Sequence, residues 1–183
     1  MALLVIMERT MDLDAIDHKI VSALEADARI SFAALADLVG LSKTPCWKRV
    51  KALEEAGVIR GYRTILNPAQ LGFGLEAFVQ VSIDVERFDA FEAAVRSHPL
   101  ITRCHATTGE ADYLLHILAT DMAALDRLLR QELNRLPGVR HTVTSMSTRE
   151  IKSDISLAEA AWHAGQQRAS AASPIPHPRA TLS

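Results

Sequence analysis

The sequence predicts an α+β protein, because three segments with helical periodicity precede a set of alternating strand-like and helix-like segments. Residues 75–85 alternate apolar and polar side chains, as a strand with one buried face does. The segments before residue 57 instead repeat their apolar residues at three- and four-residue spacing, which indicates helices. We therefore expect a helical N-terminal domain followed by a domain built on a sheet.

Serine and glycine mark the ends of the N-terminal helices. The first helix is expected over residues 14–26 with one apolar stripe (Ile16, Ile20, Val21 and Leu24). A short helix follows Ser31 and ends at Gly40, and a third runs from Ser42 to about Ala56. The short connection between them is typical of a helix-turn-helix unit. Residues 58–66 then continue as an extended segment.

The segments from residue 75 onward follow the order strand, helix, strand, strand, helix, strand. The strands are expected over residues 75–85, 101–108, 113–119 and 139–148. Pro99 ends the first helix, and Asp121 and Pro137 bound the second. This βαββαβ order predicts a ferredoxin-like sandwich with both helices on one face of the sheet. The other face is expected to carry a semi-apolar group that a second copy can cover (Phe78, Leu114, Leu118 and Met146).

The chain therefore divides into five segments. They are an N-terminal arm (1–11), the helix-turn-helix domain (12–64), a linker (65–74), the sheet domain (75–154) and a C-terminal tail (155–183). The tail is rich in Ala, Ser and Pro. We expect at most a short helix around residues 157–163 and disorder over residues 169–183.

Composition excludes several classes of protein. The chain is 49% hydrophobic and 23% charged, as globular proteins are. Its longest apolar run, Ala2–Met7, is too short for a membrane span and lacks the flanks of an export signal. Two cysteines form no disulfide framework, which favours a reducing cytoplasm.

The net charge of −2 conceals a local positive segment. Residues 42–64 hold six basic and two acidic side chains, a balance of +4. Residues 67–154 hold nine basic and twelve acidic ones, a balance of −3. A basic segment in a nearly neutral chain indicates a polyanionic partner at that segment.

The third helix has the distribution expected of a DNA-reading helix. At 100° per residue, Cys46, Val50 and Leu53 share the inward side. The outer side and its edges carry basic, hydroxyl and aromatic residues (Lys43, Thr44, Trp47, Lys48 and Lys51). This arrangement suits insertion into the major groove. The alternative is an ordinary solvated helix face, which the two helices immediately upstream make the weaker interpretation.

Neighbouring residues are expected to complete the DNA contacts. Ser42 and the first-turn N–H groups can hold a phosphate at the positive end of the helix. Arg49 can fork onto a phosphate or a guanine edge. Arg60 and Arg63, with Tyr62, can clamp the flanking backbone.

Neither metal nor enzyme chemistry is predicted. Three histidines (His105, His116 and His141) fall on different strands without chelating spacing, and adjacent Cys104 and His105 point to opposite faces. Nucleophile and phosphate-loop motifs are missing from the sequence. We expect no catalytic residue, no bound metal and no cofactor.

Together, several motifs resemble the Lrp/AsnC (leucine-responsive, feast/famine) transcription factors. The resemblance covers residues 12–152 and rests on motifs within residues 12–17, 40–62, 109–113 and 136–139. These motifs include Thr-Pro-Cys-Trp-Lys-Arg-Val, Gly-Glu-Ala-Asp-Tyr and Leu-Pro-Gly-Val. It implies a winged helix-turn-helix, a linking strand and a RAM/ACT-like βαββαβ domain. It also implies homodimers formed through that second domain, and often octamers of four dimers.

The resemblance also implies an amino-acid effector at the turn over residues 109–113, near contacts between dimers. Asp112 can accept from its ammonium group, and N–H groups around Gly109 can hold its carboxylate. Further residues are expected to line the side-chain end, from a neighbouring subunit (Tyr113, Met122, Ser145, Met146 and Ser147). Taken by itself, without the resemblance, the turn favours a simple hairpin.

We thus expect a cytoplasmic, nucleoid-associated regulator of amino-acid metabolism that binds specific double-stranded DNA and no membrane. Its response is expected to depend on a small amino acid. One alternative is an architectural protein that bends DNA without an effector. A second is a metabolite-sensing module that regulates an enzyme, against which the basic helix argues.

Overall fold

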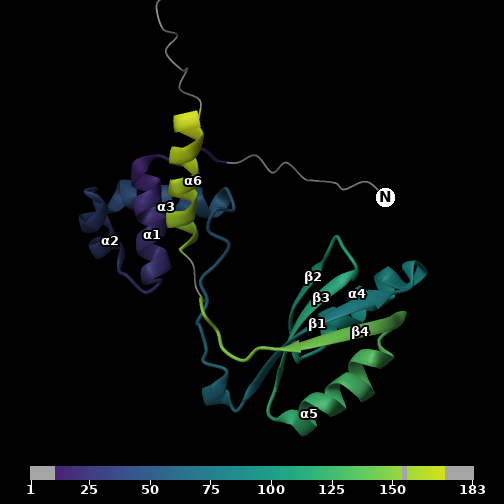
Figure 1. Ribbon diagram of the computed structural model, residues 1–183. Helices are drawn as coiled ribbons and strands as arrows, with labels where there is room; N and C mark the ends of the chain where they lie inside the picture. Colours follow the sequence, from purple (N-terminus) through teal and green to yellow (C-terminus); the bar gives the residue numbers. More distant parts are fainter. Residues whose placement is uncertain (1–10, 154–155, 172–183) are drawn as a thin grey trace, which may run out of the picture. The chain divides into compact units, whose positions relative to one another are not determined.

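The computed structural model describes residues 11–153 and 156–171, which form two compact units (Figure 1). One unit contains the described residues up to Thr64 and those from Lys152 onward, and the other contains Ile65–Ile151. Most of the predicted arm (1–10) and the end of the tail (172–183) lie outside the described residues. Among the described helices, none has the length and apolar character that a membrane span requires.

Three helices build the first unit: α1 (Ala15–Ala26), α2 (Phe32–Val39) and α3 (Lys43–Glu55). Asp14 caps α1 by accepting hydrogen bonds of 2.8 Å from the N–H groups of Ile16 and Asp17. Ser31 caps α2, and Gly40 ends it at a φ of 73°, which favours glycine. These boundaries confirm the predicted helix starts and the predicted stop of the second helix.

The core of this unit lies where the three helices meet. Cys46, Val50 and Leu53 of α3 are buried, as their spacing predicts. They pack with residues of α1 and α2 (Ile20, Leu35, Ala36 and Val39). Burial raises the pKa of the Cys46 thiol, which is consistent with a packing role. Residues 58–66 contain neither helix nor strand, although Val58 and Ile59 pack on this core.

A further helix, α6 (Leu157–Ala171), belongs to the same unit and lies along α1 (Figure 1). The prediction of a short helix over residues 157–163 with disorder from residue 169 is therefore wrong up to Ala171. The segment is rich in residues of high helix propensity, with six alanines among its 15 residues. A long-range cap adds to this, because Glu25 of α1 accepts hydrogen bonds from the N–H groups at the start of α6.

The second unit is a four-stranded antiparallel sheet in the order β2-β3-β1-β4. Its strands are β1 (Leu75–Ile83), β2 (Ile101–Ala106), β3 (Tyr113–Ala119) and β4 (Val139–Met146). Helices α4 (Phe88–Ser97) and α5 (Met122–Arg127) pack on one face. The buried core joins Val79 and Leu115 of the sheet to Phe91 and Leu128 of the helical layer. The predicted βαββαβ fold is confirmed.

Strand β1 is two residues shorter than the alternation predicts. The pattern continues to Val85, but the strand ends at Ile83 and a short 3-10 helix occupies Val85–Arg87. The carboxylate of Asp112 accepts the N–H of Ile83 at 2.9 Å, and the N–H of Asp84 donates to Gly138. These two hydrogen bonds take the place of the strand-to-strand bonds that would continue β1. The chain therefore leaves the sheet after Ile83, and Val85 turns outward.

The predicted helix between Asp121 and Pro137 is also not uniform. After α5 the chain forms a π-helical turn (Leu128–Glu132) and a 3-10 turn (Leu133–Arg135). A regular α-helix would place Glu132 on the apolar side. The wider π turn shifts the register by one residue. Leu133 is consequently buried, and Glu132 faces outward to meet His98 at 2.9 Å.

The sheet face opposite the helices differs from the prediction at one residue. Phe78, Leu114 and Leu118 lie there as expected, because Phe78 pairs with His116 and Leu114 with Gln80. Met146 pairs with Ala77, which is buried under the helices, so Met146 belongs to the helix side. Val143 pairs with Gln80 and takes its place on the open face.

Candidate nucleic-acid interface and effector site

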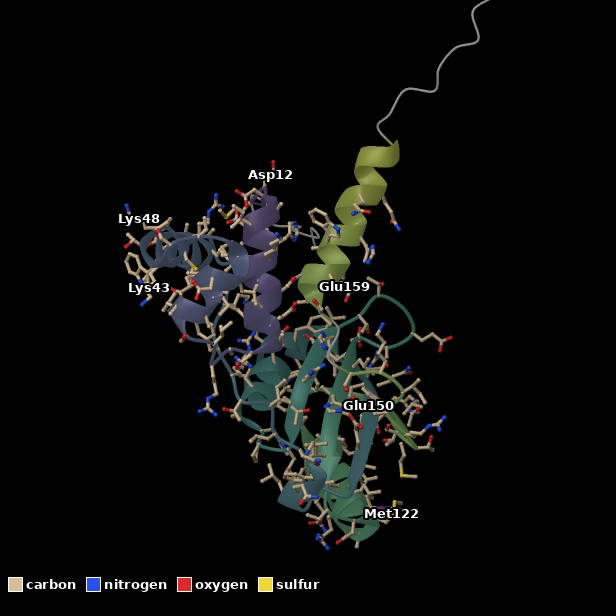
Figure 2. The ribbon with its side chains drawn as sticks, turned by 90° about the vertical axis from the view of Figure 1, so that its left-hand side faces the viewer. Asp12, Lys43, Lys48, Met122, Glu150 and Glu159 are labelled. Carbon is tan, nitrogen blue, oxygen red and sulfur yellow. The ribbon has the colours of Figure 1, made fainter. Side chains whose placement is uncertain are left out.

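The outer side of α3 presents the predicted DNA-contacting side chains to solvent. Lys43, Thr44, Trp47 and Lys48 are exposed, and Trp47 shows 48% of its surface although it is aromatic. Figure 2 shows Lys43 and Lys48 on the side of this unit that faces away from α6. Within residues 11–153 and 156–171, neither lysine forms an ion pair, so both charges are available to an external anion.

The start of α3 has hydrogen-bonding capacity that its own residues do not use. Ser42 occupies the N-cap position, but its hydroxyl makes no capping hydrogen bond. Pro45 has no N–H, which suits the first turn. The N–H groups of Lys43 and Thr44 precede the first backbone bond of the helix, which runs from Cys46 to Ser42. Such a helix end can bind a phosphate.

Arg49 is engaged inside the unit. One guanidinium nitrogen lies 2.7 Å from Asp14, the N-cap of α1, and 2.7 Å from Asp17 in its first turn. The hydrogen bond to Asp17, followed by the one to Asp14, raises the pKa of Arg49. The side chain thus joins the third helix to the first. Its sequence position gave no sign of this, because the partners lie 35 and 32 residues away.

The end of α3 is joined to the segment that follows it. The Tyr62 hydroxyl donates to Glu54 at 3.0 Å, and Lys51 pairs with the same carboxylate at 3.0 Å. The bond to Glu54 raises the pKa of Lys51. Lys51 is therefore partly neutralised. Tyr62 holds the segment that carries exposed Arg60 and Arg63 close to the end of α3.

The turn between β2 and β3 holds the first half of the predicted effector residues. Gly109 adopts a φ of 147°, and the Thr107 N–H donates to the Asp112 carbonyl at 2.9 Å. One carboxylate oxygen of Asp112 accepts from Ile83. Its other oxygen accepts no hydrogen bond from the described residues. The hairpin interpretation and an acceptor role are both compatible with this geometry.

Tyr113 lies on the helix side of the sheet. It is 4% exposed, packs 4.7 Å from the Phe91 ring and donates its hydroxyl to Glu92 at 2.9 Å. Burial, and then the bond to Glu92, raises its pKa strongly. A cavity of about 390 Å³ opens beside it between α4 and β2, a feature that sequence reasoning missed. Its polar lining includes Glu92, Arg96 and Arg103.

The second half of the predicted effector residues lies at the other end of the sheet. Asp112 bonds to Ile83 at the end of β1, whereas Met146 pairs with Ala77 near its start. Six residues of strand separate these points, about 20 Å. Ser145 and Ser147 flank Met146, and exposed Met122 follows β3 at the same end. One protomer therefore does not bring the two halves together.

Comparison with known proteins gives similarities over both units. Residues 76–157 match the family model described as the Lrp/AsnC ligand binding domain. Residues 13–60 match the model described as winged helix-turn-helix DNA-binding. The leucine-responsive regulatory protein of Salmonella typhimurium is 43% identical over 144 residues, which are 77% of this chain and 88% of that protein.

Solved structures are similar over the same range. A transcriptional regulator of Neisseria meningitidis in complex with L-methionine matches with a TM-score of 0.77 and 38% identity, over 80% of this chain and 96% of the other. AsnC of Escherichia coli matches with a TM-score of 0.75 and 25% identity, over 80% and 99%. Each of these similarities covers at least 77% of this chain and therefore extends over parts of both units.

Proposed function

Because the chain belongs to the Lrp/AsnC family of DNA-binding transcription regulators, we propose that it controls genes of amino-acid metabolism in response to an amino acid. The family regulates transcription and is not a family of enzymes. We place the protein in the cytoplasm, associated with the nucleoid. The observation that carries the DNA-binding part is the exposed side of α3 with Lys43 and Lys48, neither of which forms an ion pair with the described residues.

We propose that α3 enters the major groove with its N-terminus at a phosphate. Ser42 and the first-turn N–H groups contact that phosphate, and Lys43 and Lys48 neutralise others. Thr44 and Trp47 meet base edges and thymine methyl groups. Lys51, Arg60 and Arg63 act on the flanking backbone. Arg49 is assigned to holding α3 in position, because its guanidinium already bonds to α1.

Two copies are needed to read a site. The open sheet face carries Phe78, 39% exposed, and Val143, 46% exposed, around a polar centre in which His116 bonds to Glu76 and Thr102. A second copy can cover these rings and aliphatic groups. Such a dimer presents two α3 helices to half-sites about 34 Å apart or a multiple of it. Four dimers can then form the octamer that the family suggests.

We place the effector between subunits, because the two halves of its expected site are about 20 Å apart in one protomer. The free carboxylate oxygen of Asp112 accepts from the ammonium group, and the backbone around Gly109 holds the carboxylate. Ser145 and Ser147 of another subunit close the site. Met122 and Met146, both half-exposed, lie on the helix side of the sheet, whereas the two serines lie on its open face. The methionines therefore offer adaptable apolar surface to an aliphatic side chain that passes the edge strand β4. Tyr113, buried on the helix side of the sheet, supports the turn that precedes it.

A gel-shift titration on the DNA upstream of the protein's own gene tests this function. Each titration is run without an amino acid and with each of the twenty in turn, starting with L-leucine and L-methionine, which the names of the relatives suggest first. We expect a salt-sensitive shift that one amino acid changes. A shift that none of the twenty amino acids changes would contradict the effector part. The complete lack of a shift would contradict the DNA-binding part.

A further inference from the structure

The cavity between α4 and β2 has no part in the function proposed above. Its volume of about 390 Å³ lies within the range of small-molecule sites. Its walls come from the second half of α4, from the edge strand β2 and from Tyr113 at the start of β3. Arg96 and Arg103 line the cavity and are exposed, so a ligand can enter it from solvent.

The one carboxylate among the lining residues is already engaged by its neighbours. One oxygen of Glu92 accepts from the Tyr113 hydroxyl at 2.9 Å, and the other accepts from Arg96 at 2.9 Å. Burial, and then the nearby charge of Glu92, raises the pKa of the Cys104 thiol, so this sulfur is uncharged near neutral pH. The lining is therefore a poor acceptor for an ammonium group.

The donors of the lining, in contrast, are only partly used. Arg96 bonds to Glu92 through one terminal nitrogen, and its other N–H groups have no partner among the described residues. Arg103 forms no ion pair within the part of the chain that the structure describes. Two guanidinium groups and one carboxylate give the lining a net charge of +1. Because arginine binds carboxylates through paired N–H bonds, this charge favours a carboxylate ligand.

The remaining wall of the cavity is largely apolar. Val95 of α4 is buried. Ile101 and Ala106 of β2 pair with Ile117 and Tyr113, which places them on the helix side of the sheet. An aliphatic chain can pack against these groups while a charged end stays with the arginines near solvent.

We propose that this cavity binds a short aliphatic carboxylate that lacks an ammonium group. Arg96 and Arg103 hold the carboxylate, and the chain lies against Val95 and Ile101. Fatty acids and α-oxo acids of short chain share this chemistry. The site differs in class from the proposed effector site, where Asp112 accepts from an ammonium group, and it does not depend on that site.

Methyl NMR of the full chain tests the site, with isocaproate as the probe. Isocaproate has the carbon skeleton of leucine without the amino group. At millimolar concentration it is expected to shift the methyl signals of Val95 and Ile101 but not those of Val143 on the open face of the sheet. Isoamylamine carries the same alkyl chain on a cation and is expected to shift none of them. A parallel titration with α-ketoisocaproate identifies the preferred class as the one that binds more tightly.

Two arginine variants test the charged end of the site. Arg96→Gln is expected to weaken isocaproate binding about tenfold or more, because it removes a charged donor. Arg130→Gln is the matched control. Arg130 pairs with Asp126 four residues earlier, as Arg96 pairs with Glu92, and the two arginine side chains are 76% and 78% exposed. The control variant should bind isocaproate like the wild type.

Three results would overturn the proposal. They are unmoved Val95 and Ile101 methyl signals, binding of isoamylamine as tight as that of isocaproate, and equal losses in the two arginine variants. Excess L-leucine and the Asp112→Asn variant separate the cavity from the effector site, and both should leave the isocaproate shifts unchanged. Displacement of isocaproate by L-leucine would make the cavity part of an amino-acid site and would also overturn the proposal.

Discussion

Arg49 of α3 and Asp17 of α1 form an ion pair at 2.7 Å, in which the Asp17 side chain is only 10% exposed. The same guanidinium reaches Asp14, which is also the N-cap of α1. One arginine thus fixes the helix proposed to read DNA against the first helix of its unit. We therefore expect Arg49 to affect DNA binding through the position of α3.

Loss of this arginine is expected to destabilise the helical unit. Arg49→Ala leaves the nearly buried carboxylate of Asp17 without its charged partner, so the free energy of unfolding should fall by about 1–3 kcal/mol. Urea denaturation followed by circular dichroism measures it. Arg63→Ala, which removes an exposed arginine without an ion pair among the described residues, should change stability little. Equal effects of the two variants would argue against the structural role of Arg49.

Stability should also depend on the charge of Asp14. Hydrogen bonds, first from the Asp17 N–H and then from Arg49, hold the pKa of Asp14 below its ordinary value of 3.8. Because the pKa of Asp14 is lower in the folded state than in the unfolded state, this stabilisation is complete above pH 3.8. It is lost as the pH falls through the folded-state pKa. Asp14→Asn keeps a capping oxygen but removes the charge.

Urea denaturation over a pH series compares Asp14→Asn with the wild type. The difference in unfolding free energy should be constant near neutral pH and should shrink below about pH 4. A difference that does not change with pH would mean that the charge of Asp14 contributes nothing.

Local signals made most of the fold predictable. Asp14, Ser31 and Gly40 bound helices through bonds to residues within four positions, and the alternation from Leu75 to Ile83 marks the central strand. Such patterns depend only on neighbours in the chain. The order of the elements then leaves few topologies, which is why the βαββαβ sandwich was predicted correctly.

Features set by distant partners were not predictable. The spacing of α3 places Arg49 near an edge, but it cannot reveal that two aspartates lie within its reach. The dependence of α6 on Glu25, 131 residues from Ser156, is invisible for the same reason. Met146 was assigned to the wrong face, because the register of β4 is set by its pairing with β1.

The open sheet face should control assembly. Phe78→Glu places a charge among the apolar side chains that the second copy is proposed to cover, which should convert the dimer to monomer at micromolar concentration. Light scattering after gel filtration gives the mass. Val85→Glu is the control, because Val85 is 74% exposed and lies beyond the end of β1. An unchanged mass in Phe78→Glu would place the dimer contact elsewhere.

An effector site shared between subunits predicts complementation. Asp112→Asn and Ser147→Ala should each weaken amino-acid binding, since each damages one half of every site. Mixed and refolded together, they should regain tight binding at about a quarter of all sites, because each heterodimer contains one undamaged site. Calorimetry counts the sites. No recovery on mixing would mean that both residues serve the same subunit's site.

The salt dependence of DNA affinity tests the role of α3 most directly. It is measured by fluorescence anisotropy for the wild type, Lys48→Ala and Arg49→Ala. For Lys48→Ala we predict weaker binding to all sequences and a slope of log K against log salt that is smaller by about one. Lys19→Ala, on exposed α1 surface, should match the wild type. Arg49→Ala should keep the wild-type slope. A wild-type slope in Lys48→Ala, or a reduced slope in Arg49→Ala, would contradict the proposed DNA-binding surface.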